Sequence, residues 1–327
     1  MLEIIASFIK QAIIQGIPLL YGSTGEILTE KSGNLNLGIP GIMYIGGISG
    51  VIGAYFYEKA VVDINPFLCV MIPLLCSILG SVLMALIYCF LTVTLRANQN
   101  VTGLALTTFG VGVGNFFGGS LSSLFGDGGS ISLIRTGACF KATLPFASKL
   151  GLFGDTFLSF GFLAYLAIVI ALLCSWFLNR TRAGLSLRAV GESPATADAA
   201  GINVTKYKYL ATCIGAAIAG LGGLYFIMDY IGGAWTNGGF GDRGWLAIAL
   251  VIFALWKPKY SILGSILFGG LYIVYLYIPG LSRSSQEIFK MLPYVVTIVV
   301  LIVLSIRNRR ENQPPESLGL SYFREDR

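Results

Sequence analysis

The stretch RAVGESPATADAAGINV, residues 188–204, carries start and stop signals for a short helix. Ser193 can cap a helix N-terminus, Pro194 suits the first helical position, and Gly201 suits the left-handed residue that ends a helix. Alanines fill the body between them. We therefore predict a helix over residues 193–200. Most such loops are surface connectors, but complete signals at both ends favour a helix that docks into a partner.

Long apolar segments lie on both sides of this stretch. A helix needs about 20 apolar residues to cross the ~30 Å hydrocarbon core. Segments that meet this standard, or nearly so, are 4–22, 37–57, 67–95, 101–119, 157–178, 209–229, 244–256, 260–280 and 291–306. We expect an all-α polytopic membrane protein with about nine transmembrane segments, within a range of roughly eight to ten. Segment 244–256 is short and segment 37–57 is rich in glycine, but both are expected to be helices.

The composition agrees with a membrane protein. Of 327 residues, 55% are hydrophobic and 12% are charged, whereas soluble domains carry about a quarter charged residues. A soluble enzyme, a disordered protein and a secreted disulfide scaffold are therefore excluded. The net charge of +6 comes from basic residues that lie between apolar segments. Because these residues form no stripe, we expect no nucleic-acid partner.

The basic residues predict how the chain lies in the membrane. They concentrate in the connection 179–208, in the tail after residue 307, at Lys257 and Lys259, and at Arg96. If each segment crosses once, all four places fall on one side, and the positive-inside rule makes that side cytoplasmic. The N-terminus and the loop 120–156 are then outside, and residues 23–36 are inside or re-entrant. We expect a transmembrane domain of residues 1–306 with a cytoplasmic loop at 179–208, and a cytoplasmic tail at 307–327.

Residues that could carry catalysis are missing. The chain has no histidine, which excludes histidine-based catalysis and histidine metal sites. It has no GxxxxGK[ST] phosphate loop, HExxH or GxSxG motif. Apart from Asp229, charged residues are nearly absent from the cores of the predicted spans, which argues against a proton- or sodium-coupled carrier. We expect no catalytic, cofactor-binding or metal-ligating residue, and hence a helical pore-former that takes its energy from another subunit.

Uncharged polar residues on the apolar segments are candidates for lining a path. Their residue types, amides and hydroxyls, suit a small neutral polar solute better than an amino acid zwitterion or a phosphate. The candidates are Asn34, Asn36, Asn100, Thr107, Thr108 and Asn115, the last four on one predicted helical face. The alternative is hydrogen bonding between helices, worth about 0.6 kcal/mol each.

Two further patterns concern packing and the membrane boundary. Gly110, Gly114 and Gly118 repeat a small-xxx-small spacing and are expected to face a neighbouring helix. Arg243 stands at the outer edge of a segment and is expected to snorkel to the interface.

Residues 188–194 and 199–204 resemble the signature loop of ATP-binding-cassette (ABC) importer permeases. The group is that of branched-chain amino acid, simple sugar and nucleoside permeases. Three further stretches, in the right order, resemble the nucleoside-type members that work with a binding lipoprotein. They are 25–38, 243–249 with Trp256 and Pro258, and 286–294 with Leu318 and Gly319. Residues 33–38 lack the acidic element of the sugar permeases, which weakens a ribose-type interpretation.

This resemblance implies a function and a set of partners. The short helix would be the coupling helix, seated in a groove of an ABC ATPase subunit that binds ATP and Mg²⁺. Its residues are Glu192, Ser193, Pro194, Ala195, Thr196, Ala197, Asp198, Ala199, Ala200 and Gly201. A second permease chain, often a non-identical homologue, and an extracytoplasmic substrate-binding lipoprotein would complete an importer in the bacterial cell membrane.

The cargo implied by the resemblance is a nucleoside. A simple sugar or a branched-chain amino acid is the first alternative within the same class. A stand-alone secondary carrier or channel is the second alternative, and it would ordinarily show a buried ionisable residue. An intramembrane enzyme is the third, but the chain offers it no catalytic group.

Overall fold

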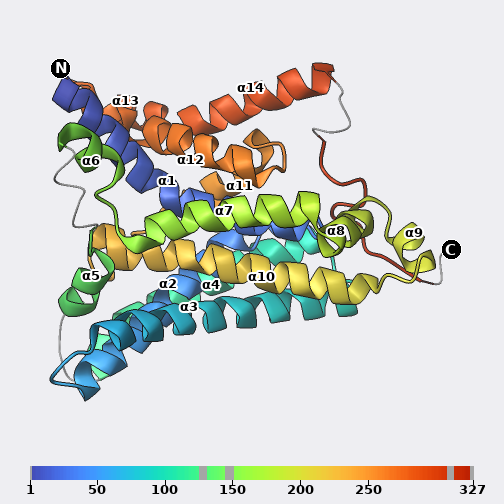
Figure 1. Cartoon of the computed structure of the whole chain (residues 1–327), viewed down its shortest axis with the longest axis horizontal. Coiled ribbons are helices and arrows are strands. Elements are labelled where there is room, and N and C mark those ends of the chain that lie inside the picture. The colour runs from blue at the N-terminus through green and yellow to red at the C-terminus, as the bar shows by residue number, and fades with distance from the viewer. Residues whose placement is uncertain (1, 125–130, 144–150, 308–312, 325–327) are drawn as a thin grey trace.

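The computed structural model describes residues 2–124, 131–143, 151–307 and 313–324. Within these ranges the regular elements are helices, and the only β-type pairing is an isolated bridge between Ser132 and Ala234. Figure 1 shows the long helices running mostly along the long axis of the molecule. The short helices α8 and α9 and the C-terminal segment lie at one end, which we call the α9 end. The N-terminus, α5 and α6 lie at the opposite end.

Eight helical stretches among the described residues are long and apolar enough to cross a membrane. Their elements are α1 (Leu2–Glu30), α2 (Ile39–Ala60), α3 (Pro66–Cys89) continued by η1 (Phe90–Thr94), α4 (Gln99–Leu124), α7 (Phe162–Arg180), α10 (Val204–Tyr225) continued by η3 (Phe226–Ile231), α12 (Pro258–Ile273) continued by η4 (Val274–Tyr277), and α13 (Arg283–Lys290) with α14 (Leu292–Arg307). The shorter helices are α5 (Ile134–Phe140), α6 (Gly151–Phe157), α8 (Arg182–Glu192), α9 (Pro194–Ala199) and α11 (Arg243–Phe253). The all-α polytopic membrane fold is confirmed.

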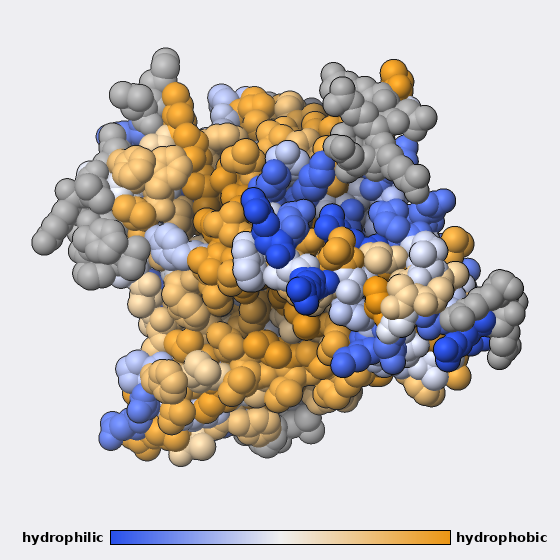
Figure 2. Space-filling view, turned by 45° about the vertical axis from the view of Figure 1, so that its right-hand side comes forward, coloured by the Kyte–Doolittle hydropathy of each residue, from blue (hydrophilic) through white to orange (hydrophobic). Residues whose placement is uncertain are grey.

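Three of the four basic regions meet at the α9 end: the connection 179–208, Lys257 and Arg96. Residues 308–312, which carry basic residues of the fourth region, lie outside the described part of the chain. Lys31, Arg188 and Lys257 line one surface hollow there. Arg96 stacks over the ring of Phe323 in the C-terminal segment, 4.5 Å from its centroid. The positive-inside rule assigns this end to the cytoplasm. Figure 2 shows the hydrophilic residues gathered around this end, beside a largely hydrophobic flank.

The first helix is longer than the sequence predicts. Residues 23–30, expected in a connection, continue α1, and the connection is residues 31–38 at the α9 end. This places Glu26 and Glu30 inside a span, 1% and 3% exposed. The expectation that the spans hold almost no ionisable residue is therefore wrong. The predicted span stopped at residue 22, before a polar stretch. In the structure the glutamates of that stretch face protein: Glu26 accepts a hydrogen bond from Asn36 N, and Glu30 accepts one from Trp256 Nε1.

Helices α2 and α10 form the centre of the bundle. Glycines bring their backbones together, since a Cβ added at Gly46 would lie 2.5 Å from Gly220 Cα. Small residues allow this close approach, which supplies packing energy in lipid. The predicted glycine face of α4 also contacts protein: a Cβ at Gly110 would lie 2.6 Å from the carbonyl oxygen of Gly41 on α2. That prediction is confirmed.

The ninth expected segment does not span the membrane as a helix. Helix α11 has 11 residues, about 16 Å at 1.5 Å per residue, against a core of ~30 Å. The non-helical segment 232–242 precedes it and starts at the opposite end, where Gly233 O accepts from Leu133 N. Together the two cross once, because Trp256, just after α11, reaches Glu30 at the α9 end. The alternation of sides is thereby preserved.

Candidate functional site

Helix α9 has the caps that its sequence predicts. Ser193 Oγ accepts from Thr196 N at 3.4 Å, and Pro194 occupies the first turn. Gly201 has a φ of +83°, a conformation that costs glycine little. Its amide donates to Asp198 O at 2.9 Å, and the next amide, of Ile202, donates to Ala197 O at 3.0 Å, which is a Schellman-type end. The predicted short helix is confirmed as α9.

One face of α9 is anchored and the other is presented to solvent. Ala197 is buried with Val190 of α8 and Val204 of α10. The exposed residues are Glu192, Ala195, Thr196, Ala199, Ala200 and Gly201, while Ser193, Pro194 and Asp198 are half-buried. The base is fixed by α8, whose own N-terminus is capped by Thr181. The result is a small rigid projection, with short side chains outward.

The charges beside α9 are partly withdrawn from water. Burial lowers the pKa of Lys31, and the nearby Glu192 carboxylate opposes that shift. Arg188, which also faces Lys31, lowers its pKa further. The base of the projection is thus a mixed-charge cluster between α8, which carries Arg188 and Glu192, and Lys31 of the connection between α1 and α2.

Five of the six residues predicted to line a path fall into two groups, and Asn115 stands apart from both. Asn34, Asn36 and Thr107 are buried and tie down the connection 31–38: Asn34 Nδ2 donates to Thr212 Oγ1 at 3.0 Å, and Thr107 Oγ1 donates to Leu37 O at 2.8 Å. Asn100 and Thr108 are exposed on α4. The four residues of α4 predicted to share one face are therefore divided: Thr107 is buried against Leu37 and Asn115 is half-buried, whereas Asn100 and Thr108 are exposed.

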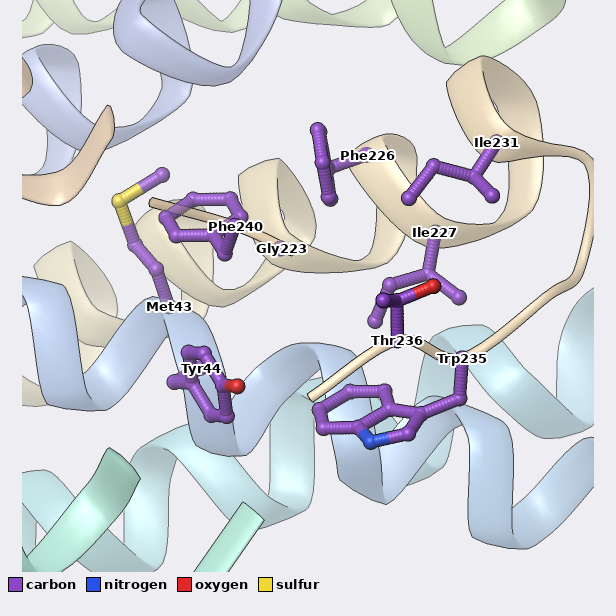
Figure 3. A pocket seen from close by; sticks show the side chains of 9 residues that line it. All are labelled: Met43, Tyr44, Gly223, Phe226, Ile227, Ile231, Trp235, Thr236 and Phe240. Carbon is purple, nitrogen blue, oxygen red and sulfur yellow. The ribbon is translucent and has the colours of Figure 1, made fainter. Parts of the chain in front are cut away.

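Asn115, the sixth candidate, lies beside an aromatic pocket near the middle of the bundle. The lining comes from α2, from the end of α10 with η3, and from segment 232–242; it consists of Met43, Tyr44, Gly223, Phe226, Ile227, Ile231, Trp235, Thr236 and Phe240. Figure 3 shows the rings of Tyr44, Phe240, Phe226 and Trp235 around a common space. The free volume between the rings is about 10 Å³, so the side chains nearly fill this space in the present conformation. We call this the aromatic pocket.

The rings of the aromatic pocket contact each other edge to face. Tyr44 meets Trp235 at 5.4 Å between centroids with an interplanar angle of 86°. Phe226 meets Phe240 at 5.2 Å and 89°. This is the geometry that aromatic pairs prefer. The π-helical turn η3 supplies Phe226, Ile227 and Ile231, and such turns are frequent at functional sites.

A polar rim borders these rings. Tyr44 Oη donates to Asn115 Oδ1 at 2.6 Å and accepts from Gly238 N at 2.8 Å. Trp235 Nε1 donates to Asn237 Oδ1 at 2.7 Å. Thr236, Asn237 and Gly238 are exposed, although they lie in a bundle with an apolar surface. Non-helical backbone inside a membrane is tolerated only within protein or against a water-filled cavity, so we expect these exposed polar groups to face protein or water rather than lipid.

Arg243 holds segment 232–242 in place. Its side chain is 8% exposed; Nη2 donates to Gln15 Oε1 at 2.9 Å and Nη1 to Phe240 O at 2.9 Å. The guanidinium lies 4.5 Å from the centre of the Phe226 ring. The expectation that Arg243 snorkels is wrong, because an unwound segment offers a carbonyl that no helix would leave free. Arg243 instead positions two rings of the aromatic pocket.

The sequence carried one unused signal for the aromatic pocket. Residues 232–242 read GGAWTNGGFGD, and the apolar segment that follows is short. A glycine-interrupted or short hydrophobic segment is a pointer to a binding site in transporters. Among the described residues, no group of three or more histidine, cysteine, aspartate or glutamate side chains could hold a metal ion.

Comparisons with known proteins agree over most of the chain. Residues 8–301 match the family described as the branched-chain amino acid transport system permease component. A putative glucose ABC transporter permease protein of Haloferax volcanii is 31% identical over 98% of each chain. A nucleoside ABC transporter permease protein of Lactococcus lactis is 32% identical over 90% of each chain. A guanosine ABC transporter permease protein of Bacillus subtilis is 28% identical over 91% of this chain and 92% of the relative.

Proposed function

Because this chain belongs to the family of branched-chain amino acid transport system permease components, we propose that it is the membrane subunit of an ATP-driven nucleoside importer. An ABC transporter permease is a transport subunit rather than an enzyme. In our proposal ATP and Mg²⁺ bind to a partner ATPase, a non-identical permease completes the path, and a binding lipoprotein delivers the solute. The observation that carries the coupling part is α9, a capped helix that projects at the cytoplasmic end.

The exposed face of α9 is the surface on which the ATPase acts. Its caps make it rigid, and its anchor at Ala197 connects it to α8 and α10. Short outward side chains, chiefly alanines, suit insertion into a groove, because they lose little side-chain entropy when they are buried. A movement of α9 is then transmitted to α10, which is itself a span, and through α8 to the neighbouring span α7.

The aromatic pocket supports a nucleoside cargo. Aromatic rings stack on nucleobases with about 1–3 kcal/mol per base, and the amides and hydroxyls of the rim suit the polar edges of a base or ribose. No charge lines the pocket itself, which favours a neutral solute. In this conformation the rings contact one another, so the solute must part them to pass. Relatives named for nucleoside and guanosine transport support the same cargo.

A simple sugar is the second candidate cargo. The Haloferax volcanii relative named as a putative glucose permease is 31% identical over 98% of this chain. Aromatic rings also stack on the apolar faces of sugars, so the pocket does not separate the two solutes. A branched-chain amino acid fits less well, because no charged side chain lines the pocket to pair with its ammonium or carboxylate.

Uptake of labelled guanosine tests the proposal. Cells with and without the gene, in a strain lacking other nucleoside importers, are compared in the presence of unlabelled nucleosides, glucose, ribose or leucine. We expect the gene to confer uptake that only nucleosides inhibit. Inhibition by glucose or ribose would replace the cargo with a sugar. Uptake that persists without the ATPase subunit would overturn the importer class.

A further inference from the structure

The C-terminal segment 313–324 folds back onto the α9 end and contacts three separate parts of the chain. These are the α8–α9 pair, the connection 31–38 between α1 and α2, and the connection 95–98 between α3 and α4. The segment has no helix or strand of its own. Its conformation is therefore set by what it touches.

The contact with α8 and α9 uses backbone at one point and side chains at another. Ser317 N donates to Gly191 O at 3.0 Å. Tyr322 Oη donates to Asp198 Oδ2 at 2.9 Å, and Arg324 Nε lies 3.2 Å from the same oxygen. Arg324 is 75% exposed, and an exposed ion pair contributes little. The half-buried hydroxyl of Tyr322 is the stronger tie.

Asp198 stands where the helix alone would disfavour it. It lies in the last turn of α9, and a carboxylate there meets the negative end of the helix dipole. Two side chains of the C-terminal segment, Tyr322 and Arg324, reach Asp198 Oδ2, and both are hydrogen-bond donors. The position of Asp198 is thus explained by the C-terminal segment and not by helix formation.

The contact with the connection 31–38 depends on two left-handed glycines. Gly319 N donates to Gly33 O at 3.2 Å, and φ is +80° at Gly319 and +85° at Gly33. A Cβ added at Gly33 would lie 2.8 Å from Ser317 Oγ. The two backbones therefore fit closely without side chains between them.

The contact with the connection 95–98 passes through Gln99 and Arg96. Gln99 Nε2 donates to Leu320 O at 3.4 Å, and its Oε1 accepts from Leu35 N at 2.7 Å. Ser321 Oγ donates to Arg96 O at 3.5 Å. Gln99, at the start of α4, thus joins the C-terminal segment to both connections at once.

We propose that segment 313–324 is a latch that transmits movement of α9, through Asp198, to the helices α2 and α4. Helix α2 begins just after the connection 31–38 and carries Tyr44, and α4 carries Asn115. The latch therefore joins α9 to two elements of the aromatic pocket, whereas the hydrophobic anchor of α9 lies on α8 and α10. This inference rests on the proposed role of α9 as the surface on which the ATPase acts.

The test measures solute imported per ATP hydrolysed by the complete transporter in proteoliposomes. One variant lacks residues 313–327, a second is Tyr322→Phe, and the matched control is Tyr260→Phe, an exposed tyrosine at the start of α12. We expect the truncation, which removes several hydrogen bonds, to lower the ratio about tenfold. Tyr322→Phe, which removes one hydrogen bond, should lower it about twofold. The control should match the wild type. Asp198→Asn combined with Tyr322→Phe should lower the ratio little more than Tyr322→Phe alone.

The outcomes separate the latch from the proposed function. An unchanged ratio in the truncated transporter would overturn the latch while leaving the importer intact. Loss of the ATPase subunit from the purified truncated complex would also overturn it, and would make the segment an assembly element. If wild-type proteoliposomes show no ATP-dependent nucleoside uptake, the proposed function fails first.

Discussion

Helix α9 and the aromatic pocket differ in how far apart their residues are in the sequence. The start, body and stop of α9 all lie within residues 193–201. The aromatic pocket gathers residues from Met43 to Phe240, with Asn115 at its rim. A local element is specified by neighbours in the chain, so it can be recognised from a pattern. A pocket made of distant elements exists only once those elements pack.

The two regions also differ in what surrounds them. Around α9 the residues are hydrophilic and exposed, so an unpaired polar group can be hydrated. The rings of the aromatic pocket lie buried inside the bundle, where an unsatisfied polar group costs about 1–3 kcal/mol. Accordingly Tyr44 and Trp235 each have a hydrogen-bond partner from the protein. Changes at α9 should therefore affect coupling, and changes at the pocket should affect both the path and the stability of the fold.

Deleting residues 193–200 is expected to have the largest effect. It removes α9 while leaving the spans, so ATP-driven uptake should fall to background and membrane insertion should persist. Gly201→Pro should act in the same direction, because proline holds φ near −65° where the structure has +83°. Uptake by vesicles and the amount of protein in the membrane fraction check both parts. Normal ATP-driven uptake by a well-expressed deletion would contradict it.

Trp235→Ala should have the next largest effect, and at the other region. The Trp235 ring packs on Tyr44 and covers Gly118, so its removal leaves a cavity that costs about 3–5 kcal/mol. We expect a lower melting temperature and strongly reduced uptake, with the ATPase subunit still bound. Trp176→Ala, at an exposed position on α7, is the matched control. Equal loss of stability in both variants would show that the pocket has no special part in the fold.

Tyr44→Phe sharpens the comparison because it removes one oxygen from the rim. The variant leaves Gly238 N and Asn115 Oδ1 without the hydroxyl that each now contacts. Each of these two hydrogen bonds contributes about 0.5–1.5 kcal/mol. We expect uptake to fall about tenfold while ATPase binding is unchanged. A variant with normal uptake and normal solute preference would remove the rim from the path.

Ser193→Ala should have the smallest effect, confined to α9. Loss of the N-cap costs about 1 kcal/mol, so α9 should fray and the solute imported per ATP should fall a few-fold. Ser193→Asp retains a capping oxygen and should restore the ratio. Measurements on reconstituted transporter check this. If the alanine and aspartate variants behave alike, the cap is not what keeps α9 effective.

Some differences between expectation and structure follow from polar residues that find partners only in the fold. The predicted first span ended at residue 22, yet α1 continues through Glu26 and Glu30, which accept hydrogen bonds from Asn36 N and Trp256 Nε1. Arg243 was expected at the interface and is buried against Gln15 and Phe240. Hydropathy counts the charge in each case, whereas Glu30 and Arg243 have partners more than 200 residues away in the chain, at Trp256 and Gln15.

The sequence by itself determined the apolar spans and the capped helix α9, and it predicts their orientation. These depend on transfer into lipid, on flanking Lys and Arg, and on hydrogen bonds between neighbours, all of which are local properties. Only the tertiary structure decided that segment 232–242 is non-helical, that the aromatic pocket exists, and that residues 313–324 bind Asp198 and Gly33. The physical reason is that a side chain or an unwound backbone is stable at depth only when distant residues supply its hydrogen bonds.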